Sequence, residues 1–264
     1  QSELRQLLKK HDMLPKKGLG QHFLISESAI NAIVSSVEGC KGVLEIGPGP
    51  GILTAPLSQK GGVTAVEIDE RALAVLKETA PNATIIQGDA LKVDLTELLD
   101  ALGEPRAVVS NLPYYITGPL LTRIAEARRS FHMAVLMMQK EVADRIVALP
   151  GDRHRGSLSV FLQCQFEIET VAQVPAGAFL PPPKVDSMVL KFLPKRDQFS
   201  DSFFRLVRIS FAQPRKTLAN NLMSGLNLGR DTIESALVKH GMSTTVRAFE
   251  LQLEHWTNLA ADLA

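Results

Sequence analysis

The stretch VVSNLPYYIT (108–117) passes from an apolar run into four residues that together could bind a flat aromatic amine. Asn111 has an amide oxygen that can accept an N–H bond, and Pro113 fixes the backbone so that the carbonyl of Leu112 can accept a second one. Tyr114 adds a planar face on which a base can stack. Asn and Pro are also common turn residues, so the same stretch could simply end a strand. The neighbouring secondary-structure elements are needed to distinguish a base-binding site from the simple end of a strand.

Short β-rich runs alternate with helical stretches on both sides of this tetrad. Residues 26–37 show the helical spacing of apolar side chains, with Ser26 placed to cap the helix. The β-rich runs that follow are 42–47, 63–68, 84–90, 107–111 and 132–138. The segments between these runs are long enough for crossover helices, so the pattern predicts an α/β fold with a mostly parallel, doubly wound sheet.

Two later β-rich runs, 164–174 and 184–193, have no long helix between them, and they predict an antiparallel hairpin at the edge of the sheet. After the second run the strand patterns stop and helical periodicity takes over. We therefore predict one domain over residues 1–194, which includes a basic N-terminal segment over 1–25, and a small helical domain over 195–264.

The composition excludes several classes of protein. With 45% hydrophobic and 22% charged residues, the chain has the make-up of an ordinary globular protein. No apolar run reaches the length of a membrane span, and the N-terminus lacks the apolar centre of a signal peptide, so we expect a cytoplasmic protein with no membrane association. Cys40 and Cys164 are too few for a disulfide framework, and the histidines lack metal-ligand spacing, so we expect no metal.

The net charge of +1 favours no particular partner, but basic side chains gather in two places. Residues 1–17 hold five basic and two acidic side chains, and residues 203–247 hold seven basic and two acidic ones. Such clusters are typical of a phosphate-binding surface. They are equally typical of solvated helix faces, so charge alone leaves both interpretations open.

Gly47, Gly49 and Gly51 directly follow the first strand of the predicted sheet. Residues without a Cβ let the backbone turn sharply and approach a ligand closely. A dinucleotide fingerprint would need glycine where the chain has Ile52, so that class is disfavoured. The G-x-G-x-G spacing instead resembles motif I of the class I S-adenosylmethionine-dependent methyltransferases, in which this loop meets the amino-acid end of the cofactor.

Acidic residues end the next two predicted strands. Glu67, followed by Ile68, is placed where a carboxylate could accept from both ribose hydroxyls of that cofactor, although an acid plays the same part in NAD enzymes. Asp89, followed by Ala90, is placed to accept from the adenine amino group. Each acid could instead cap the helix after its strand. With the glycine loop, three successive strand ends carry the groups expected of a methyltransferase.

A methyl donor at this edge of the sheet gives the Asn-Leu-Pro-Tyr tetrad a chemical task. The exocyclic amine of adenine is a poor nucleophile because its lone pair is delocalised into the ring. Two acceptors, the Asn111 amide oxygen and the Leu112 carbonyl, favour a pyramidal nitrogen whose lone pair faces the methyl group. No strong general base is needed, and most of the acceleration would come from alignment. In a folded RNA the base must be extruded to reach such a pocket.

Four motifs together resemble the ribosomal RNA adenine N6,N6-dimethyltransferases. They are NLPYYIT (111–117), KKGLGQHFL (16–24), AFLPPPKVDS (178–187) and FAQPRKTLANNL (211–222). The resemblance covers nearly the whole chain, and it implies the Rossmann-like fold of class I methyltransferases with S-adenosylmethionine as cofactor. The sequence departs from the family's usual pattern at Tyr115, where Asn is common.

The resemblance also assigns roles to individual residues. Gln21, His22 and Leu24 are expected to close over the cofactor. Phe179 is expected to stack on the target base opposite Tyr114. The basic residues expected to contact RNA are Lys16, Lys17, Arg208, Arg215 and Lys216.

The implied activity is transfer of methyl groups from S-adenosylmethionine to N6 of two adjacent adenosines in a hairpin near the 3′ end of small-subunit (16S) ribosomal RNA. The implied partner is this RNA within a pre-ribosomal small subunit, and the enzyme would act as a monomer during ribosome biogenesis. Two alternatives stay open: a large-subunit ribosomal RNA adenine methylase, and an assembly factor that binds RNA without catalysis. The glycine loop, Glu67, Asp89 and Asn111 count against the second alternative.

Overall fold

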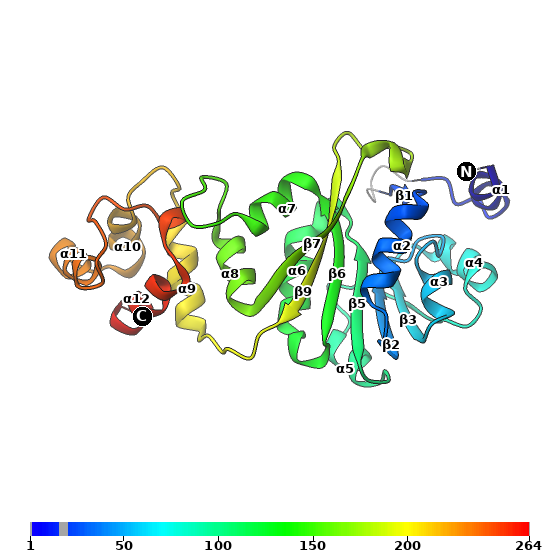
Figure 1. Ribbon diagram of the computed structural model, residues 1–264, viewed down its shortest axis with the longest axis horizontal. Helices are drawn as coiled ribbons and strands as arrows, with labels where there is room; N and C mark the ends of the chain where they lie inside the picture. Colours follow the sequence, from blue (N-terminus) through cyan, green and yellow to red (C-terminus); the bar gives the residue numbers. More distant parts are fainter. Residues whose placement is uncertain (1, 16–20, 264) are drawn as a thin grey trace. The chain divides into compact units, whose positions relative to one another are not determined.

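The computed structural model describes residues 2–15 and 21–263 (Figure 1). The chain forms two compact units, each made of two stretches of sequence. The first unit contains residues 1–143 and 168–194, and the second contains residues 144–167 and 195–264.

A seven-stranded sheet forms the centre of the first unit, with the strand order β4-β3-β2-β5-β6-β9-β7. Its strands are β2 (Gly42–Ile46), β3 (Gly62–Glu67), β4 (Thr84–Gln87), β5 (Arg106–Asn111), β6 (Met133–Gln139), β7 (Phe166–Val174) and β9 (Ser187–Pro194). Strands β2 to β6 pair in parallel, and β9 runs antiparallel to β6. A separate antiparallel pair joins β1 (Phe23–Leu24) to β8 (Phe179–Leu180). The predicted α/β fold, with a mostly parallel sheet and an antiparallel edge, is confirmed.

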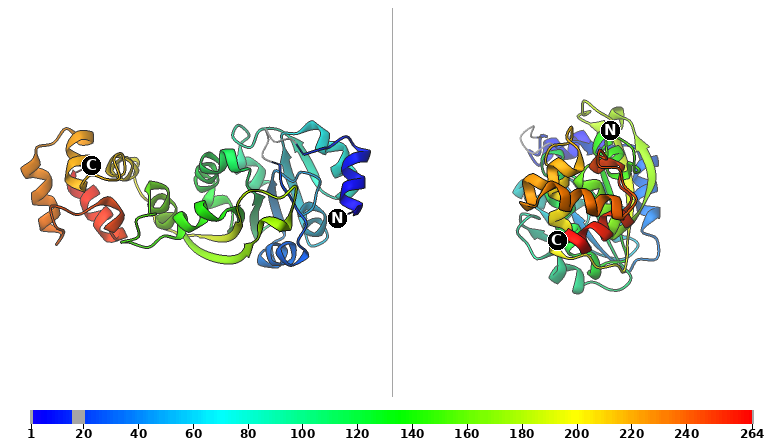
Figure 2. Two further views of the ribbon diagram at one scale, coloured as in Figure 1. Left: turned by 90° about the horizontal axis from the view of Figure 1, so that it is seen from above. Right: turned by 90° about the vertical axis from the view of Figure 1, so that its left-hand side faces the viewer.

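Helices cover both faces of this sheet because the side chains of a strand alternate between the faces. The helices and turns of the first unit are α1 (Ser2–Lys10), α2 (Glu27–Ser36), α3 (Thr54–Ser58), α4 (Glu70–Thr79), α5 (Leu95–Asp100), η2 (Tyr114–Ile116), α6 (Thr117–Glu126), η3 (Arg128–Ser130) and η4 (Ala176–Ala178). Apolar residues of α2 and α3 pack with Val43 and Val109 of the sheet. Helix α6, which buries Leu120 and Leu121, lies on the opposite face from α2 (Figures 1 and 2).

Local sequence explains where two of these helices begin. Ser26 caps α2 as predicted, because its side chain accepts from the backbone N–H of Ala29. Asp69 caps α4 in the same way by accepting from the backbone N–H of Arg71. Helix α1 then packs against α4 through an apolar cluster that includes Leu8.

The second unit is helical in the part of the chain that the structure describes. Helix α7 (Lys140–Val147) leads into it, and its other elements are α8 (Ser157–Gln165), α9 (Asp201–Ser210), α10 (Leu218–Leu226), α11 (Arg230–Lys239), η5 (Ala248–Glu250) and α12 (Leu253–Leu263). Trp256 is fully buried in the core of this unit, together with Phe203 and Leu222.

The predicted domain boundary at 194 and the observed units differ over residues 144–167. Val160 and Cys164 of α8 pack in the core of the C-terminal helices, so this stretch folds with the second unit. An apolar helix face shows that a helix is buried on one side, but it does not show which core receives it.

The described residues contain neither a membrane-spanning helix nor a metal-binding cluster. No helix among them is both long enough and apolar enough to cross a membrane. No three His, Cys, Asp or Glu side chains in the described ranges are grouped so that they could hold a metal ion.

A buried glycine at the start of β2 gives a test of the sheet's packing. A Cβ on Gly42 would lie 2.6 Å from the Cβ of Leu102 and 2.7 Å from the carbonyl oxygen of Gly103, and neither atom is at the end of a flexible side chain. Overpacking of this kind costs about 1–3 kcal/mol. We expect Gly42→Ala to lower the melting temperature by roughly 5 °C, measured by calorimetry.

The matched control is Gly62, which pairs with Gly42 in the parallel ladder. A Cβ on Gly62 would meet only the carbonyl oxygen of Lys41, at 3.6 Å, an ordinary contact. Gly62→Ala should therefore leave the melting temperature unchanged or raise it slightly. Equal destabilisation by both substitutions would contradict the packing argument.

Candidate active site

A cavity of about 360 Å³ opens where the parallel strands β2, β3, β4 and β5 end. Ligands of open α/β sheets bind at this edge, and the volume lies in the range of small-molecule sites. Every residue that lines the cavity belongs to the first unit.

The predicted cofactor-binding residues line this cavity, and so do the predicted catalytic residues other than Phe179. They are Gln21, His22, Leu24, Gly47, Gly49, Glu67, Ile68, Asp89, Ala90, Asn111, Leu112, Pro113 and Tyr114. The structure thus brings together residues from five separate stretches of chain, and their roles toward a ligand stay predictions.

The glycine loop turns in a conformation that other residues rarely adopt. The φ angles of Gly47, Gly49 and Gly51 are +70°, +55° and +85°. The N–H of Gly47 donates to the carbonyl of Val66 at 2.9 Å, which ties the loop to β3. A Cβ on Gly49 would come within 3.2 Å of the Phe23 ring. Glycine is therefore required here by backbone conformation and, at Gly49, by a close approach as well.

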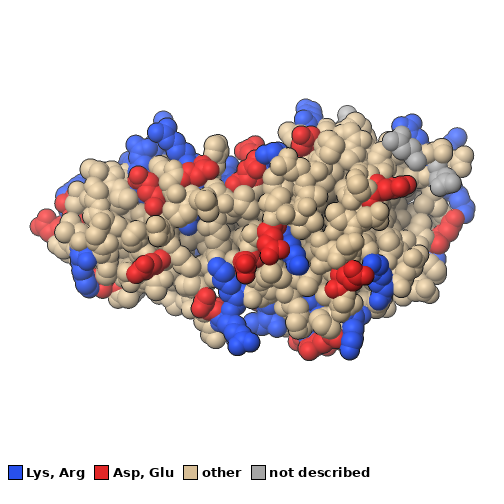
Figure 3. Space-filling view, in the orientation of Figure 1, with Lys and Arg blue, Asp and Glu red and all other residues tan. Residues whose placement is uncertain are grey.

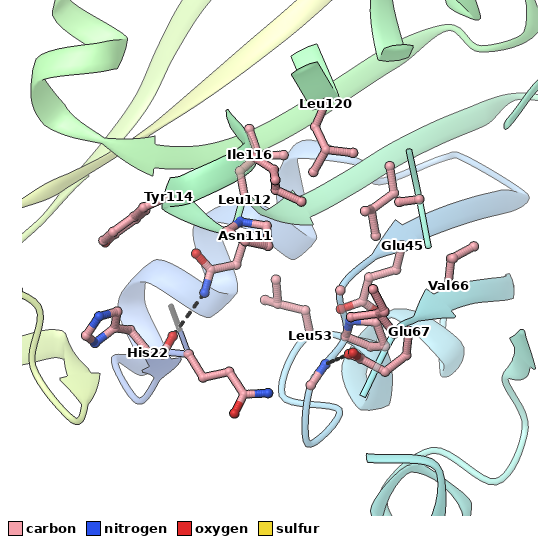
Figure 4. A pocket seen from close by; sticks show the side chains of 18 of the residues that line it. His22, Glu45, Leu53, Val66, Glu67, Asn111, Leu112, Tyr114, Ile116 and Leu120 are labelled. Carbon is pink, nitrogen blue, oxygen red and sulfur yellow. Dashed lines mark hydrogen bonds between the residues drawn. The ribbon is translucent and has the colours of Figure 1, made fainter. Parts of the chain in front are cut away.

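The Glu67 carboxylate is held by two backbone N–H groups. One oxygen accepts from Gly49 at 2.9 Å, and the other accepts from Asp69 at 2.8 Å. Figure 4 shows the first of these bonds crossing from the glycine loop to Glu67. The residue is 5% exposed, and burial raises the pKa of its carboxyl group, opposed by these two bonds. Each oxygen keeps a second lone pair that could accept from a ligand.

Glu45, one strand away on β2, is a second buried acid that the sequence analysis did not single out. It lines the cavity, and its Oε2 atom has no hydrogen-bond partner among the described residues. Burial raises the pKa of Glu45 to about 8; the neighbouring Thr54 hydroxyl opposes the shift and Glu67 adds to it. At neutral pH this carboxyl group is therefore mostly protonated.

Asp89 follows β4 and is about three-quarters buried. Its Oδ1 atom accepts from the backbone N–H of Leu91 at 3.0 Å, and its Oδ2 atom lies 3.6 Å from the Lys92 ammonium. The bond from Leu91 in the turn after β4 and the predicted ligand contact are compatible, because a carboxylate can accept several hydrogen bonds.

Asn111 ends β5 with its side-chain amide in a fixed orientation. The amide nitrogen donates to the carbonyl oxygen of His22 at 3.1 Å, the second bond drawn in Figure 4. A carbonyl can only accept, so the nitrogen must face His22 and the amide oxygen Oδ1 is left for another donor. No described residue donates to that oxygen. The orientation that the sequence analysis required of Asn111 is present without a ligand.

The loop after Asn111 is fixed by the start of the next helix. The N–H of Leu112 donates to Met137 on β6 at 2.9 Å, which anchors the residue while leaving its carbonyl without a donor among the described residues. The carbonyl of Pro113 accepts from Ile116 and from the Thr117 hydroxyl. The loop conformation is therefore built into the sequence NLPYYIT.

Tyr114 and His22 form a stacked pair at the cavity wall, with ring centroids 5.7 Å apart and an angle of 26° between the rings. Each ring is held by a hydrogen bond. The Tyr114 hydroxyl lies 2.8 Å from the Ser187 hydroxyl, and Nδ1 of His22 donates to the carbonyl of Pro181 at 2.8 Å. Burial raises the pKa of Tyr114, against the opposing effect of Ser187, so the phenol is neutral at physiological pH.

Phe179 does not line the cavity, and its stacking on a base stays a prediction. The residue pairs with Leu24 across the β1–β8 ladder, is 2% exposed, and belongs to the core cluster that includes Ile33. Burial of an aromatic side chain stabilises the fold by about 1.5–3 kcal/mol, which favours the core position.

The predicted RNA-contacting residues lie elsewhere. Lys16 and Lys17 are outside the described residues. Arg208 is exposed in the last turn of α9, and Arg215 and Lys216 are exposed in the loop between α9 and α10. Buried Asn221 of α10 holds this loop by donating to the Ser210 and Gln213 carbonyls and accepting from the Gln213 N–H.

The cavity is also lined by residues that the sequence analysis did not assign to a ligand, most of them without a chemical signature of their own. They are Phe23, Glu45, Ile46, Pro48, Pro50, Ile52, Leu53, Val66, Gly88, Leu91, Tyr115, Ile116 and Leu120. Glu45 could have been identified from the sequence, because an acid inside an otherwise apolar strand is expected to be buried.

Comparisons with known proteins place this site in a family context. The family described as ribosomal RNA adenine dimethylase matches residues 14–264. Two curated relatives, the ribosomal RNA small subunit methyltransferase A of Bacillus cereus (strain B4264) and that of Bacillus thuringiensis (strain Al Hakam), are each 40% identical to this chain over 273 residues. These alignments cover 97% of this chain and 94% of each relative.

Two solved structures are similar over most of their length. A dimethyladenosine transferase from Plasmodium falciparum is 27% identical, with a TM-score of 0.74 over 90% of this chain and 96% of that one. The 23S rRNA methyltransferase ErmE is 26% identical, with a TM-score of 0.69 over 91% of this chain and 99% of that one.

The raised pKa of Glu45 predicts a pH-dependent stability. The folded state holds a proton up to about pH 8 that the unfolded chain releases near its ordinary pKa of 4.5. The stability that this proton contributes is full below pH 4.5 and is lost as the pH rises through 8. Glu45→Gln, which cannot ionise, should match the wild type near pH 5 and exceed its melting temperature by on the order of 5 °C at pH 9.

Glu97→Gln is the matched control, because Glu97 is an exposed acid on α5. Its melting temperature should follow the wild type across the same pH range. If Glu45→Gln and the wild type gave parallel pH profiles, Glu45 would be ionised in the folded protein and its assignment as a neutral acid would be wrong.

Proposed function

Because the chain belongs to the ribosomal RNA adenine dimethylase family, we propose that it methylates N6 of two adjacent adenosines in a hairpin near the 3′ end of small-subunit ribosomal RNA. The chain is an S-adenosylmethionine-dependent ribosomal RNA adenine dimethyltransferase by family. The observation that carries the proposal is the Asn111 amide, whose nitrogen is held by His22 and whose oxygen faces no other donor.

The residues of the cavity fit the cofactor. Positive φ angles at Gly47 and Gly49 let the backbone pass close to a ligand, and Glu67 offers a buried carboxylate at the end of the next strand. Asp89 offers a further acceptor at the end of the third strand. S-adenosylmethionine supplies an electrophilic methyl group on a sulfonium sulfur when it is bound.

The chain's own part in the reaction is to hold the amine of the substrate. Asn111 Oδ1 accepts one N–H of the adenine amine, and the Leu112 carbonyl accepts the other. These two bonds set the direction of the nitrogen lone pair. Tyr114, held by Ser187 and stacked with His22, supplies an aromatic wall for the base. Alignment of this kind can supply about 7–11 kcal/mol of the barrier, so no general base is required.

The second methylation sets a further requirement on the site. A monomethylated amine has one N–H left, so only one of the two acceptors is used. The product methyl group then occupies the space beside the other acceptor. Asn111 is partly exposed in the cavity, which supports the presence of that space.

The choice of the small subunit rests on relatives and motifs. The relatives named small subunit methyltransferase are 40% identical to this chain, whereas the 23S rRNA methyltransferase is 26% identical. The segments FAQPRKTLANNL (211–222) and PPPKVDS (181–187) also favour the small-subunit enzymes. The dimethyladenosine transferase is 27% identical and supports the dimethylated product.

The setting of the reaction is part of the proposal. We take the enzyme to act as a cytoplasmic monomer on a pre-ribosomal small subunit. On the face seen in Figure 3, basic and acidic side chains are interspersed.

Substitution of Asn111 tests the proposed activity. Purified wild-type protein should label under-methylated small ribosomal subunits with radiolabelled S-adenosylmethionine, and should leave large subunits unlabelled. Asn111→Ala removes one acceptor and should lower labelling at least 100-fold, because a preorganised hydrogen-bond group is worth about 10²–10³ in rate. Filter binding should show that the variant still binds the RNA.

Two outcomes would redirect the assignment. Labelling of large subunits alone would make the protein a large-subunit methylase. Absence of cofactor binding to the wild type in calorimetry would favour an assembly factor that binds RNA without catalysis. Full activity in Asn111→Ala would contradict the role of this residue.

Replacing the exposed basic pair of the α9–α10 loop tests the RNA-binding proposal. Arg215 and Lys216 form no ion pair with the described residues, so both charges are available to phosphate. The double variant Arg215→Gln/Lys216→Gln should weaken RNA binding and reduce the slope of log affinity against log salt by roughly 1.4–1.8. Cofactor affinity should not change.

Lys239→Gln is the control for this test. The Lys239 ammonium is already paired with Asp262 at 2.8 Å, so its loss should leave the salt slope nearly unchanged. An equal change in slope for Lys239→Gln would show that net charge, and not the position of the loop, governs binding.

A further inference from the structure

An ion pair between buried Asp69 and partly exposed Arg71 lies directly beside the cavity and outside the residues assigned to it. Arg71 of α4 donates to both carboxylate oxygens of Asp69, with Nε to Oδ1 at 2.9 Å and Nη2 to Oδ2 at 2.6 Å. The side chain of Asp69 is 5% exposed and that of Arg71 is 24% exposed. Two parallel bonds of this kind fix both partners in one geometry.

The pair also holds two separate stretches of the N-terminal chain. Arg71 Nη1 donates to the carbonyl oxygens of Asp12 and Leu14, at 3.3 and 3.1 Å. Asp69 Oδ2 accepts from the side-chain amide of Gln21 at 2.9 Å. One guanidinium and one carboxylate therefore anchor chain on both sides of residues 16–20.

Asp69 is hydrogen-bonded to one group assigned to the reaction, and Gln21 directly precedes another. The backbone N–H of Asp69 donates to Glu67 Oε1, one of the two bonds that hold this carboxylate. Gln21 lines the cavity and precedes His22, whose carbonyl orients the Asn111 amide. The ion pair thus lies between the predicted cofactor carboxylate and the predicted amine acceptor.

We propose that Asp69 and Arg71 are positioning residues for methyl transfer. They fix Gln21, and through the adjoining backbone they fix the carbonyl of His22 that sets the direction of the Asn111 amide. Through the Asp69 backbone they also fix Glu67. The inference rests on the proposed function of the cavity and adds to it two residues that contact neither substrate nor cofactor.

The Asp69–Arg71 ion pair stays ionised across the physiological pH range. Hydrogen bonds from Arg71 lower the pKa of Asp69 to about 2; burial acts against the shift and Gln21 adds to it. Asp69 is therefore ionised throughout the physiological range, and the ion pair is not a pH switch. Removal of Arg71 leaves the buried Asp69 carboxylate without its charged partner.

Arg71→Met tests the proposal, since methionine keeps much of the side-chain length and removes every donor. We expect a rise in the dissociation constant for S-adenosylmethionine and a fall in kcat, each about tenfold, from the loss of charge-assisted hydrogen bonds. The KM for the ribosomal subunit should stay unchanged. Gln21→Ala should act in the same direction, and the double variant should show less than the sum of the two effects.

Asp69→Asn is a second variant that removes the ion pair and is expected to keep the fold. Asparagine caps helices as well as aspartate, so α4 keeps its cap. Its amide nitrogen takes the place of one carboxylate oxygen and cannot accept from Arg71, so the paired bonds and the charge attraction are lost. The variant should therefore fold, as judged by circular dichroism, and show the same kinetic change as Arg71→Met.

Glu78→Gln is the matched control. Glu78 on α4 holds the same N-terminal segment through Lys10 at 2.7 Å and His11 at 2.9 Å, but it has no contact with Asp69, Gln21 or Glu67. Cofactor affinity and kcat should not change in this variant. If Glu78→Gln matched Arg71→Met, the pair would only anchor the segment, and the positioning role would be overturned.

The failure of this inference and that of the proposed function are distinguishable. A wild type that bound cofactor but labelled neither subunit would contradict the function, while calorimetry would still compare the variants. A wild type and Arg71→Met with equal cofactor affinity and equal kcat would overturn the positioning role and leave the function in place.

Discussion

One hydrogen bond, from the Asn111 amide nitrogen to the His22 carbonyl, sets which atom of the Asn111 amide is available to a ligand. A primary amide can exchange the places of its oxygen and nitrogen by a half-turn, and only one of the two orientations accepts from an amine. The two residues are 89 positions apart in sequence. The orientation of this amide is therefore set by backbone that the fold brings from the N-terminal segment.

The parallel register explains why much of this site could be predicted from the sequence. Ile46 pairs with Val66 on one side and with Ser110 on the other. The residues that follow each of these, Gly47, Glu67 and Asn111, therefore lie along one edge. Ser110 reinforces the register by donating its hydroxyl to the Ile46 carbonyl at 2.7 Å. Strand ends are readable in a sequence because apolar runs stop there, so residue type at the stop indicates ligand chemistry.

The features that the sequence did not reveal depend on contacts between distant residues. Phe179 has the residue type of a stacking platform, and only its pairing with Leu24 shows that its ring belongs to the core. Helix α8 has an apolar face that either unit could bury. The Asp69–Arg71 pair looks like an ordinary helix cap, and its partners at Asp12, Leu14 and Gln21 become visible only when the chain is folded.

Two buried acids beside one cavity carry an electrostatic cost that a purely structural fold would avoid. Glu67 offsets part of that cost with two backbone N–H groups, whereas Glu45 has an oxygen without a partner and a pKa of about 8. A proton on Glu45 removes the repulsion between its carboxyl group and that of Glu67, and so lowers the cost of placing two acids beside one cavity. The backbone N–H groups of Gly49 and Asp69 fix the direction of the Glu67 carboxyl group, which the cavity presents to a ligand.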